Sequence, residues 1–238
     1  MKQLIRISAV LLFAFLSPFF QAQKTAYYVD KDALYKQGLE LFDKKQYVSA
    51  QKNFSEYAAI STPSILKSDA LFYAAACGIE LANRDSEWLM RQLIEKNPSS
   101  TKLNSAYLYL GKSSFRKKKY PEALDYFKTI DIYKLDKEQL AEFYFKRGYS
   151  FLQTGSDEKA KADFYEIKDV DNKYAFPANY YYSHISYKEK NYEIALQGFN
   201  RLVDNETFGS VVPYYITQIY FIQGKYEKVV QEAPKLLS

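Results

Sequence analysis

The sequence predicts an all-α protein, an elongated solenoid of about six stacked helix pairs. A small residue, an alanine twelve positions later and a phenylalanine four positions after that recur along the chain. The copies begin at intervals of 34–37 residues, which is typical of stacked supersecondary units. Only 8 glycines and 7 prolines occur among 238 residues, and the apolar residues fall at helical spacing. These observations favour helical repeats over turn-rich β structure.

The pattern is complete in three segments, and a serine replaces the glycine in a fourth. The small residues stand at positions 38, 75, 111, 148, 183 and 217, so they are separated by 37, 36, 37, 35 and 34 residues. The second segment lacks the later alanine and phenylalanine, and the last has Val229 in place of the alanine. Small residues let two helices cross closely, and the phenylalanine fills the space beside the crossing. The residues predicted to make this packing are Gly38, Ala50, Phe54, Gly111, Ala123, Phe127, Gly148, Ala160, Phe164, Ala195 and Phe199.

Residues 1–22 are expected to form a secretory signal peptide. Lys2 and Arg6 precede an apolar stretch, residues 10–16, which is too short to span a bilayer. We expect cleavage after Ala22; a retained membrane anchor is the alternative. Residues 23–30 would be an N-terminal extension and residues 31–238 the solenoid. Its repeats are predicted near residues 31–64, 68–98, 104–135, 141–172, 176–207 and 210–238.

The charge balance argues against a nucleic-acid partner. Lys and Arg number 33 in the whole chain, and subtracting Lys2 and Arg6 leaves 31 basic against 28 acidic residues, a net charge of +3. A nucleic-acid-binding protein normally has a concentrated basic face. Cys77 is the only cysteine, so the chain can form no internal disulfide and carries no N-terminal cysteine for a lipid. We expect Cys77 to be a small buried apolar residue.

The chemistry-bearing residues are too few to predict a catalytic site. His184 is the only histidine, which excludes a histidine-based metal cluster. Residues 111–114 read Gly-Lys-Ser-Ser, but a phosphate-binding loop needs a glycine five positions earlier, where Ala106 stands. The sequence therefore predicts no enzyme, no cofactor and no metal.

Four concordant copies of the pattern resemble the tetratricopeptide repeat over roughly residues 31–236. The resemblance implies a right-handed superhelix of helix pairs, with a concave groove lined mainly by the first helix of each pair. The degenerate segment around Ala75 and the longer joins at residues 131–138 and 169–177 depart from the pattern, which leaves the local curvature open.

The resemblance also places groove residues three before, one after and four after each small residue. Related proteins that bind a C-terminal carboxylate carry Lys and Asn there, whereas most of these positions are aromatic in this chain. That favours an extended apolar or aromatic peptide, or a partner helix, and a ladder of rings can also stack on sugars. For Phe72 and Phe145 a place in the core is equally open. The predicted groove residues are Tyr35, Phe42, Phe72, Lys112, Phe115, Phe145, Tyr149, Tyr180, His184, Tyr187, Tyr214 and Gln218.

The leading functional hypothesis is a non-enzymatic scaffold that binds partner proteins or peptides in the bacterial cell envelope. We expect export to the periplasm or outer-membrane periphery of a Gram-negative bacterium, with no transmembrane span after signal cleavage. The alternative is a glycan-binding periplasmic or outer-membrane-associated protein. The last segment ends in Leu236 and Leu237 without a polar capping helix, so we also expect further C-terminal repeats or self-association.

Overall fold

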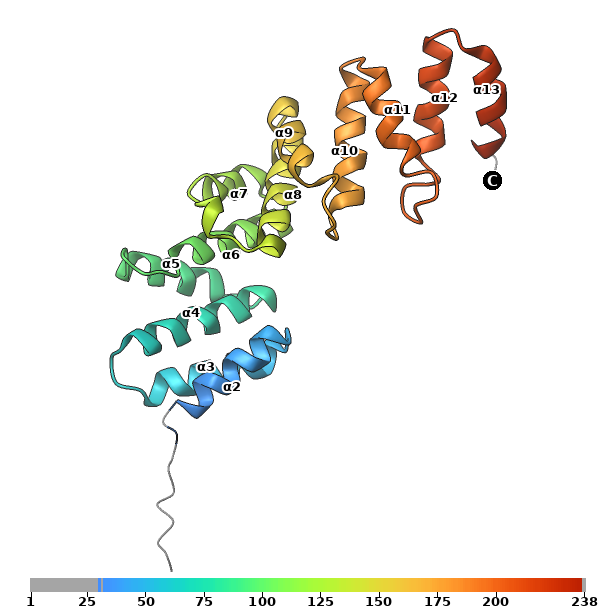
Figure 1. Ribbon diagram of the computed structural model, residues 1–238. Coiled ribbons are helices and arrows are strands. Elements are labelled where there is room, and N and C mark those ends of the chain that lie inside the picture. Colours follow the sequence, from blue (N-terminus) through green and yellow to red (C-terminus); the bar gives the residue numbers. More distant parts are fainter. Residues whose placement is uncertain (1–29, 31, 237–238) are drawn as a thin grey trace, which may run out of the picture. The chain divides into compact units, whose positions relative to one another are not determined.

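The computed structural model describes residue 30 and residues 32–236, and all regular structure in this part of the chain is helical (Figure 1). The described helices form six successive pairs, which confirms the predicted all-α fold of about six helix-turn-helix repeats. The expected signal peptide lies outside the described residues. The pairs are α2 (Ala33–Asp43) with α3 (Tyr47–Ile60), α4 (Ile65–Glu80) with α5 (Ser86–Lys96), α6 (Leu103–Arg116) with α7 (Tyr120–Phe127), α8 (Lys137–Gln153) with α9 (Asp157–Ile167), α10 (Ala175–Lys188) with α11 (Tyr192–Asn200), and α12 (Val212–Ile222) with α13 (Tyr226–Glu232).

Each described helix pair is joined by the same turn. Seven positions after the small residue of the first helix, the backbone is left-handed, with φ between 58° and 78°. The next N–H donates to the carbonyl five residues back, at 2.8–2.9 Å, as from Gln46 to Leu41. This is the Schellman arrangement, which pairs carbonyls that the end of a helix would otherwise leave free. The left-handed residues are Lys45, Ala82, Lys118, Gly155, Lys190 and Gly224.

The two helices of a pair cross where the small residue meets the phenylalanine ring. A Cβ built on Gly111 would lie 2.5 Å from Cε1 of Phe127, so α6 can approach α7 this closely only because position 111 has no side chain. Gly38 stands in the same relation to Phe54. The alanines and phenylalanines predicted to pack at these crossings are all buried, at no more than 1% exposure.

The second pair makes its crossing one position earlier than the other pairs. Its left-handed residue, Ala82, keeps the usual offset, but Ser86 and Met90 take the places of the alanine and the phenylalanine. They are 3% and 0% exposed, and the Ser86 side chain packs against Gly78. The repeat that looks degenerate in the sequence is therefore a helix pair whose crossing residues stand one position earlier, with the first of them, Ser86, at the start of α5.

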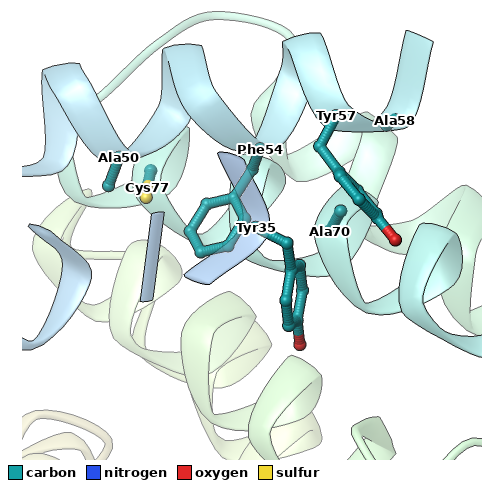
Figure 2. Close-up of a cluster of buried hydrophobic side chains, with 7 residues drawn as sticks. All are labelled: Tyr35, Ala50, Phe54, Tyr57, Ala58, Ala70 and Cys77. Carbon is teal, nitrogen blue, oxygen red and sulfur yellow. The ribbon is translucent and has the colours of Figure 1, made fainter. Parts of the chain in front are cut away.

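The core consists of clusters that join each pair to the first helix of the next. In the first cluster, Tyr35, Phe54 and Tyr57 pack with Ala70 and Cys77 of α4 (Figure 2). Cys77 is fully buried, and burial raises the pKa of its thiol to about 12. The prediction that Cys77 is a buried apolar residue is confirmed. None of the described helices is both long and apolar enough to cross a membrane.

Replacing Ala82 with glycine is expected to raise the free energy of unfolding by up to about 1 kcal/mol, because glycine adopts a left-handed backbone without the clash of a Cβ. The matched change Ala162→Gly, at an exposed site inside α9, should lower it by about 1 kcal/mol. Urea unfolding followed by circular dichroism measures both changes. Equal effects at the two positions would contradict the assigned turn.

Candidate functional site

The predicted groove residues fall into different environments rather than along one open surface. Tyr35 and Phe72 are buried, at 8% and 6% exposure, and Phe42 packs partly buried against the first two clusters. At the far end of the chain Tyr214 is 52% exposed, and Gln218 is half-buried. The remaining predicted residues are half-buried and belong to the clusters described below; they are Lys112, Phe115, Phe145, Tyr149, Tyr180, His184 and Tyr187.

A charge cluster links the first helices of three successive pairs. Lys112 Nζ of α6 lies 2.9 Å from Glu80 Oε1 of α4 and 3.0 Å from Glu142 Oε2 of α8. Lys146 Nζ lies 3.6 Å from the other oxygen of Glu142, and Arg116 Nη1 lies 3.5 Å from Glu80 Oε2. All of these side chains except Arg116 are only 15–18% exposed. We call these five residues the charge cluster.

Pairing outweighs burial at two members of the charge cluster, Glu142 and Lys112. Burial alone would raise the pKa of the Glu142 carboxyl, but attraction to Lys112 and Lys146 outweighs it and holds that pKa below its usual value. Burial likewise opposes the charge on Lys112, yet Glu142 and Glu80 raise its pKa. Burial raises the pKa of the Tyr174 hydroxyl, and so do the charge of Glu142 and a hydrogen bond to it. Both Glu142 and Lys112 are therefore charged near neutral pH.

A pocket of about 410 Å³ opens beside the charge cluster, and we call it the central pocket. Its lining comes from the end of α2, the start of α3 and the turn between them, from α4, α6 and α8, and from the joins before α8 and α10. At its rim Glu138 Oε1 lies 3.4 Å from the ammonium groups of both Lys45 and Lys173, and all three side chains are more than half exposed. The rings of Tyr47 and Tyr109 form an aromatic part of the pocket wall. The central pocket therefore offers charges of both signs next to aromatic surface.

Interlocked rings follow the charge cluster along the first helices. The rings of Phe145 and Tyr174 stack at 4.9 Å, and Phe115 meets Tyr149 edge-on at 5.7 Å. The ring of Tyr149 also lies 5.9 Å from that of Tyr120 and 5.3 Å from that of Tyr181. These rings mostly contact one another. They therefore leave fewer free faces than an open aromatic ladder would.

The rings around His184 continue this run, since Tyr180 of α10 meets Tyr181 edge-on at 5.3 Å. Tyr180 stacks on Phe208 at 4.8 Å, and the His184 ring lies 5.4 Å from Tyr215. Burial lowers the pKa of His184, and the nearby Lys188 lowers it further, so the imidazole is neutral at pH 7. Tyr187 packs on Tyr215 at 5.4 Å.

Sequence reasoning missed several members of these sites. Lys112 was predicted, but its partners Glu80 and Glu142 stand at no groove offset of the repeat. Phe208 and Tyr174 lie in the joins between pairs, where the repeat pattern makes no prediction. Of the residues that were missed, only Tyr215 could have been found from the sequence, because it stands in an aromatic run two positions before Thr217.

Comparison with known proteins identifies similar folds but no close relative. No protein-family model matches the sequence, and no curated protein matches it. A tetratricopeptide repeat protein from Parabacteroides merdae is 16% identical, with 87% of this chain and 78% of that chain covered and a TM-score of 0.57. PilF of Pseudomonas aeruginosa is 15% identical, with 87% and 90% covered and a TM-score of 0.61. The C-terminal part of a repeat-containing protein from Cytophaga hutchinsonii is 16% identical, with 99% and 91% covered and a TM-score of 0.62.

The substitution Glu142→Gln is expected to lower the free energy of unfolding at pH 7 by about 1–3 kcal/mol, because hydrogen-bonded charges of the cluster lose a partner. The pKa of Glu142 is depressed in the folded state, so its contribution is present above the unfolded value of about 4.3 and is lost as the pH falls through the lower folded value. Urea unfolding at a series of pH values should show the wild type and the variant converging below about pH 4.

The control is Glu40→Gln, at an exposed position of α2, which should change stability by no more than about 0.5 kcal/mol at any of these pH values. A gap between wild type and Glu142→Gln that does not depend on pH would show that the Glu142 charge does not stabilise the fold.

Proposed function

Because this chain has the tetratricopeptide-repeat fold, which mediates protein–protein interactions, we propose that it is a non-enzymatic scaffold that binds a partner protein. The binding site is the groove along the first helices, and a peptide segment of the partner occupies it. The central pocket carries the proposal, since side chains from several repeats converge there around a preformed charge cluster.

The pocket's charges favour a peptide that itself carries charged side chains. The ion pairs of Glu138 with Lys45 and Lys173 are exposed, so each stabilises the fold by only about 0–1 kcal/mol. A charged side chain of the partner can therefore replace one member of such a pair at little cost. The Lys112 pairs are mostly buried and would stay in place as a rigid wall. The ligand proposed for this part of the groove is therefore a charged extended peptide rather than a purely aromatic one.

The proposed location is the envelope of a Gram-negative bacterium, in the periplasm or at the outer-membrane periphery. The predicted signal peptide at residues 1–22 supports it. Mass spectrometry of the protein isolated from its own cells is expected to find a chain that begins at Gln23. An intact N terminus at Met1 in the isolated protein would contradict export by cleavage.

A photo-crosslinking residue at Gln139, which lines the central pocket, tests the groove in intact cells. We expect it to capture a protein partner, whereas the same residue at exposed Glu166 of α9 should not. The charge-swapped variant Lys45→Glu, Glu138→Lys, Lys173→Glu keeps its internal ion pairs but reverses the rim charges. It should capture the partner on the order of tenfold less, because like charges then oppose each other.

Equal capture from the two positions, or capture that the charge swap leaves unchanged, would contradict binding in the central pocket. A glycan bound at position 139 with no protein would favour the glycan-binding alternative. Self-association through the last helix pair stays a separate prediction.

A further inference from the structure

A second groove lies between α3 and α5, with α4 as its floor. It holds about 470 Å³ and shares no lining residue with the central pocket. Its apolar wall includes Leu71, Trp88 and Leu89, which are 40%, 55% and 45% exposed. We call it the α3–α5 groove.

Trp88 stands where the other described repeats carry no large apolar side chain. Because Ser86 takes the place of the crossing alanine, Trp88 is two positions after it on the second helix. A repeat of this fold therefore does not need an aromatic ring at this position, and packing within the helix pair does not explain the exposed Trp88. The residues two positions after the crossing residue in the other repeats are all exposed, and they are Lys52, Asp125, Ala162, Gln197 and Gln231.

The α3–α5 groove is preformed rather than a gap that side chains can close. Its floor includes the small residues Ala74 and Ala75. Gln51 of α3 donates through Nε2 to the Ala74 carbonyl at 3.1 Å and accepts from Asn83 Nδ2 at 3.0 Å. These two bonds tie α3 to α4 and to the turn before α5, so the walls keep their separation.

The shape and the charge of the groove narrow the class of ligand. Both walls are helices, whose backbone groups are already paired, and this groove, unlike the central pocket, offers an extended segment almost no charged side chains to bind instead. A helix satisfies its own backbone and can present an apolar face to such a groove. Lys96 is the one charged side chain among the described lining residues. The complementary ligand is therefore an apolar helix face with a carboxylate at the Lys96 end.

We infer that the α3–α5 groove binds an amphipathic, acidic α-helix of a partner protein. The apolar residues of that helix, spaced three and four apart, would cover Trp88, Leu89 and Leu71, and one of its carboxylates would pair with Lys96. This surface is independent of the central pocket, so the protein can hold two partner segments at once.

Trp88 is the only tryptophan of the chain, so its fluorescence reports on this groove alone. The probe is a helical 16-residue peptide with leucines on one face at spacings of three and four and glutamates elsewhere; a second peptide carries lysines in place of the glutamates. We expect the glutamate peptide to shift the Trp88 emission to shorter wavelength and to bind at least about tenfold more tightly than the lysine peptide.

Three variants test whether the peptide binds in the α3–α5 groove. Lys96→Glu should reverse the preference between the two peptides, and Ala74→Met should weaken binding by filling the floor. Ala162→Met, the same substitution at an exposed site on α9, should leave binding unchanged. The charge-swapped variant of the central pocket should also bind the glutamate peptide normally, so failure at one site does not imply failure at the other.

No change in Trp88 emission with either peptide would overturn the inference. Binding that Lys96→Glu and Ala74→Met leave unaltered would overturn it too. An emission shift that appears without peptide and grows with protein concentration would instead assign the groove to a second copy of the chain, which contradicts a partner helix as its occupant.

Discussion

The structure depends on one close contact, the crossing of two helices at a residue with almost no side chain. At Gly111 the backbone of α6 lies so near the Phe127 ring that no Cβ fits between them. Since about 0.8 kcal/mol is gained for each methylene removed from water, the rings of Phe54, Phe127, Phe164 and Phe199, buried at four of the described crossings, are a large part of the stability of their repeats. The left-handed residue seven positions later returns the chain so that the second helix can make this contact.

The same crossing decides which side chains reach the groove. Lys112 follows Gly111 directly, so it leaves the helix on a different side from the crossing and meets the neighbouring first helices. There it lies between Glu80 and Glu142, and each partly buried charge is paired. A buried ion pair contributes little net stability, but loss of one partner is costly, so such a network favours one arrangement of the three helices. The proposed peptide site is therefore built on a rigid wall with an exposed, exchangeable rim.

The helix pairs could be predicted because their information is local and repeated. A period of 34–37 residues and a small residue, alanine and phenylalanine at fixed spacing indicate helix pairs without any long-range contact. The left-handed position of the shared turn is a glycine only at Gly155 and Gly224. In the other described pairs it is a lysine or an alanine, which does not indicate a left-handed backbone in the sequence. The shift of Ser86 and Met90 was missed because a serine and a methionine do not look like an alanine and a phenylalanine.

The candidate sites were harder to predict because they depend on how neighbouring pairs are arranged. Glu80, Lys112 and Glu142 come from three repeats, and no spacing in the sequence indicates that they meet. Most aromatic residues predicted to line the groove also pack against one another, because burying a large aromatic ring is favourable. Trp88 does not pack against other rings in this way and stays 55% exposed. The packing of the repeat does not account for this exposed ring, which is why we assign it to a binding surface.

The most direct measurement is a double-mutant cycle of Gly111→Ala and Phe127→Leu, with the free energy of unfolding as the readout. Overpacking a core costs about 1–3 kcal/mol, and the helix propensity of alanine, about 1 kcal/mol more favourable than that of glycine, offsets part of this cost. Gly111→Ala is therefore predicted to destabilise the protein by up to about 2 kcal/mol, and much less when Phe127→Leu has already made room. A Gly111→Ala variant about 1 kcal/mol more stable than the wild type, as in an unconstrained helix, would contradict the close crossing on which the fold depends.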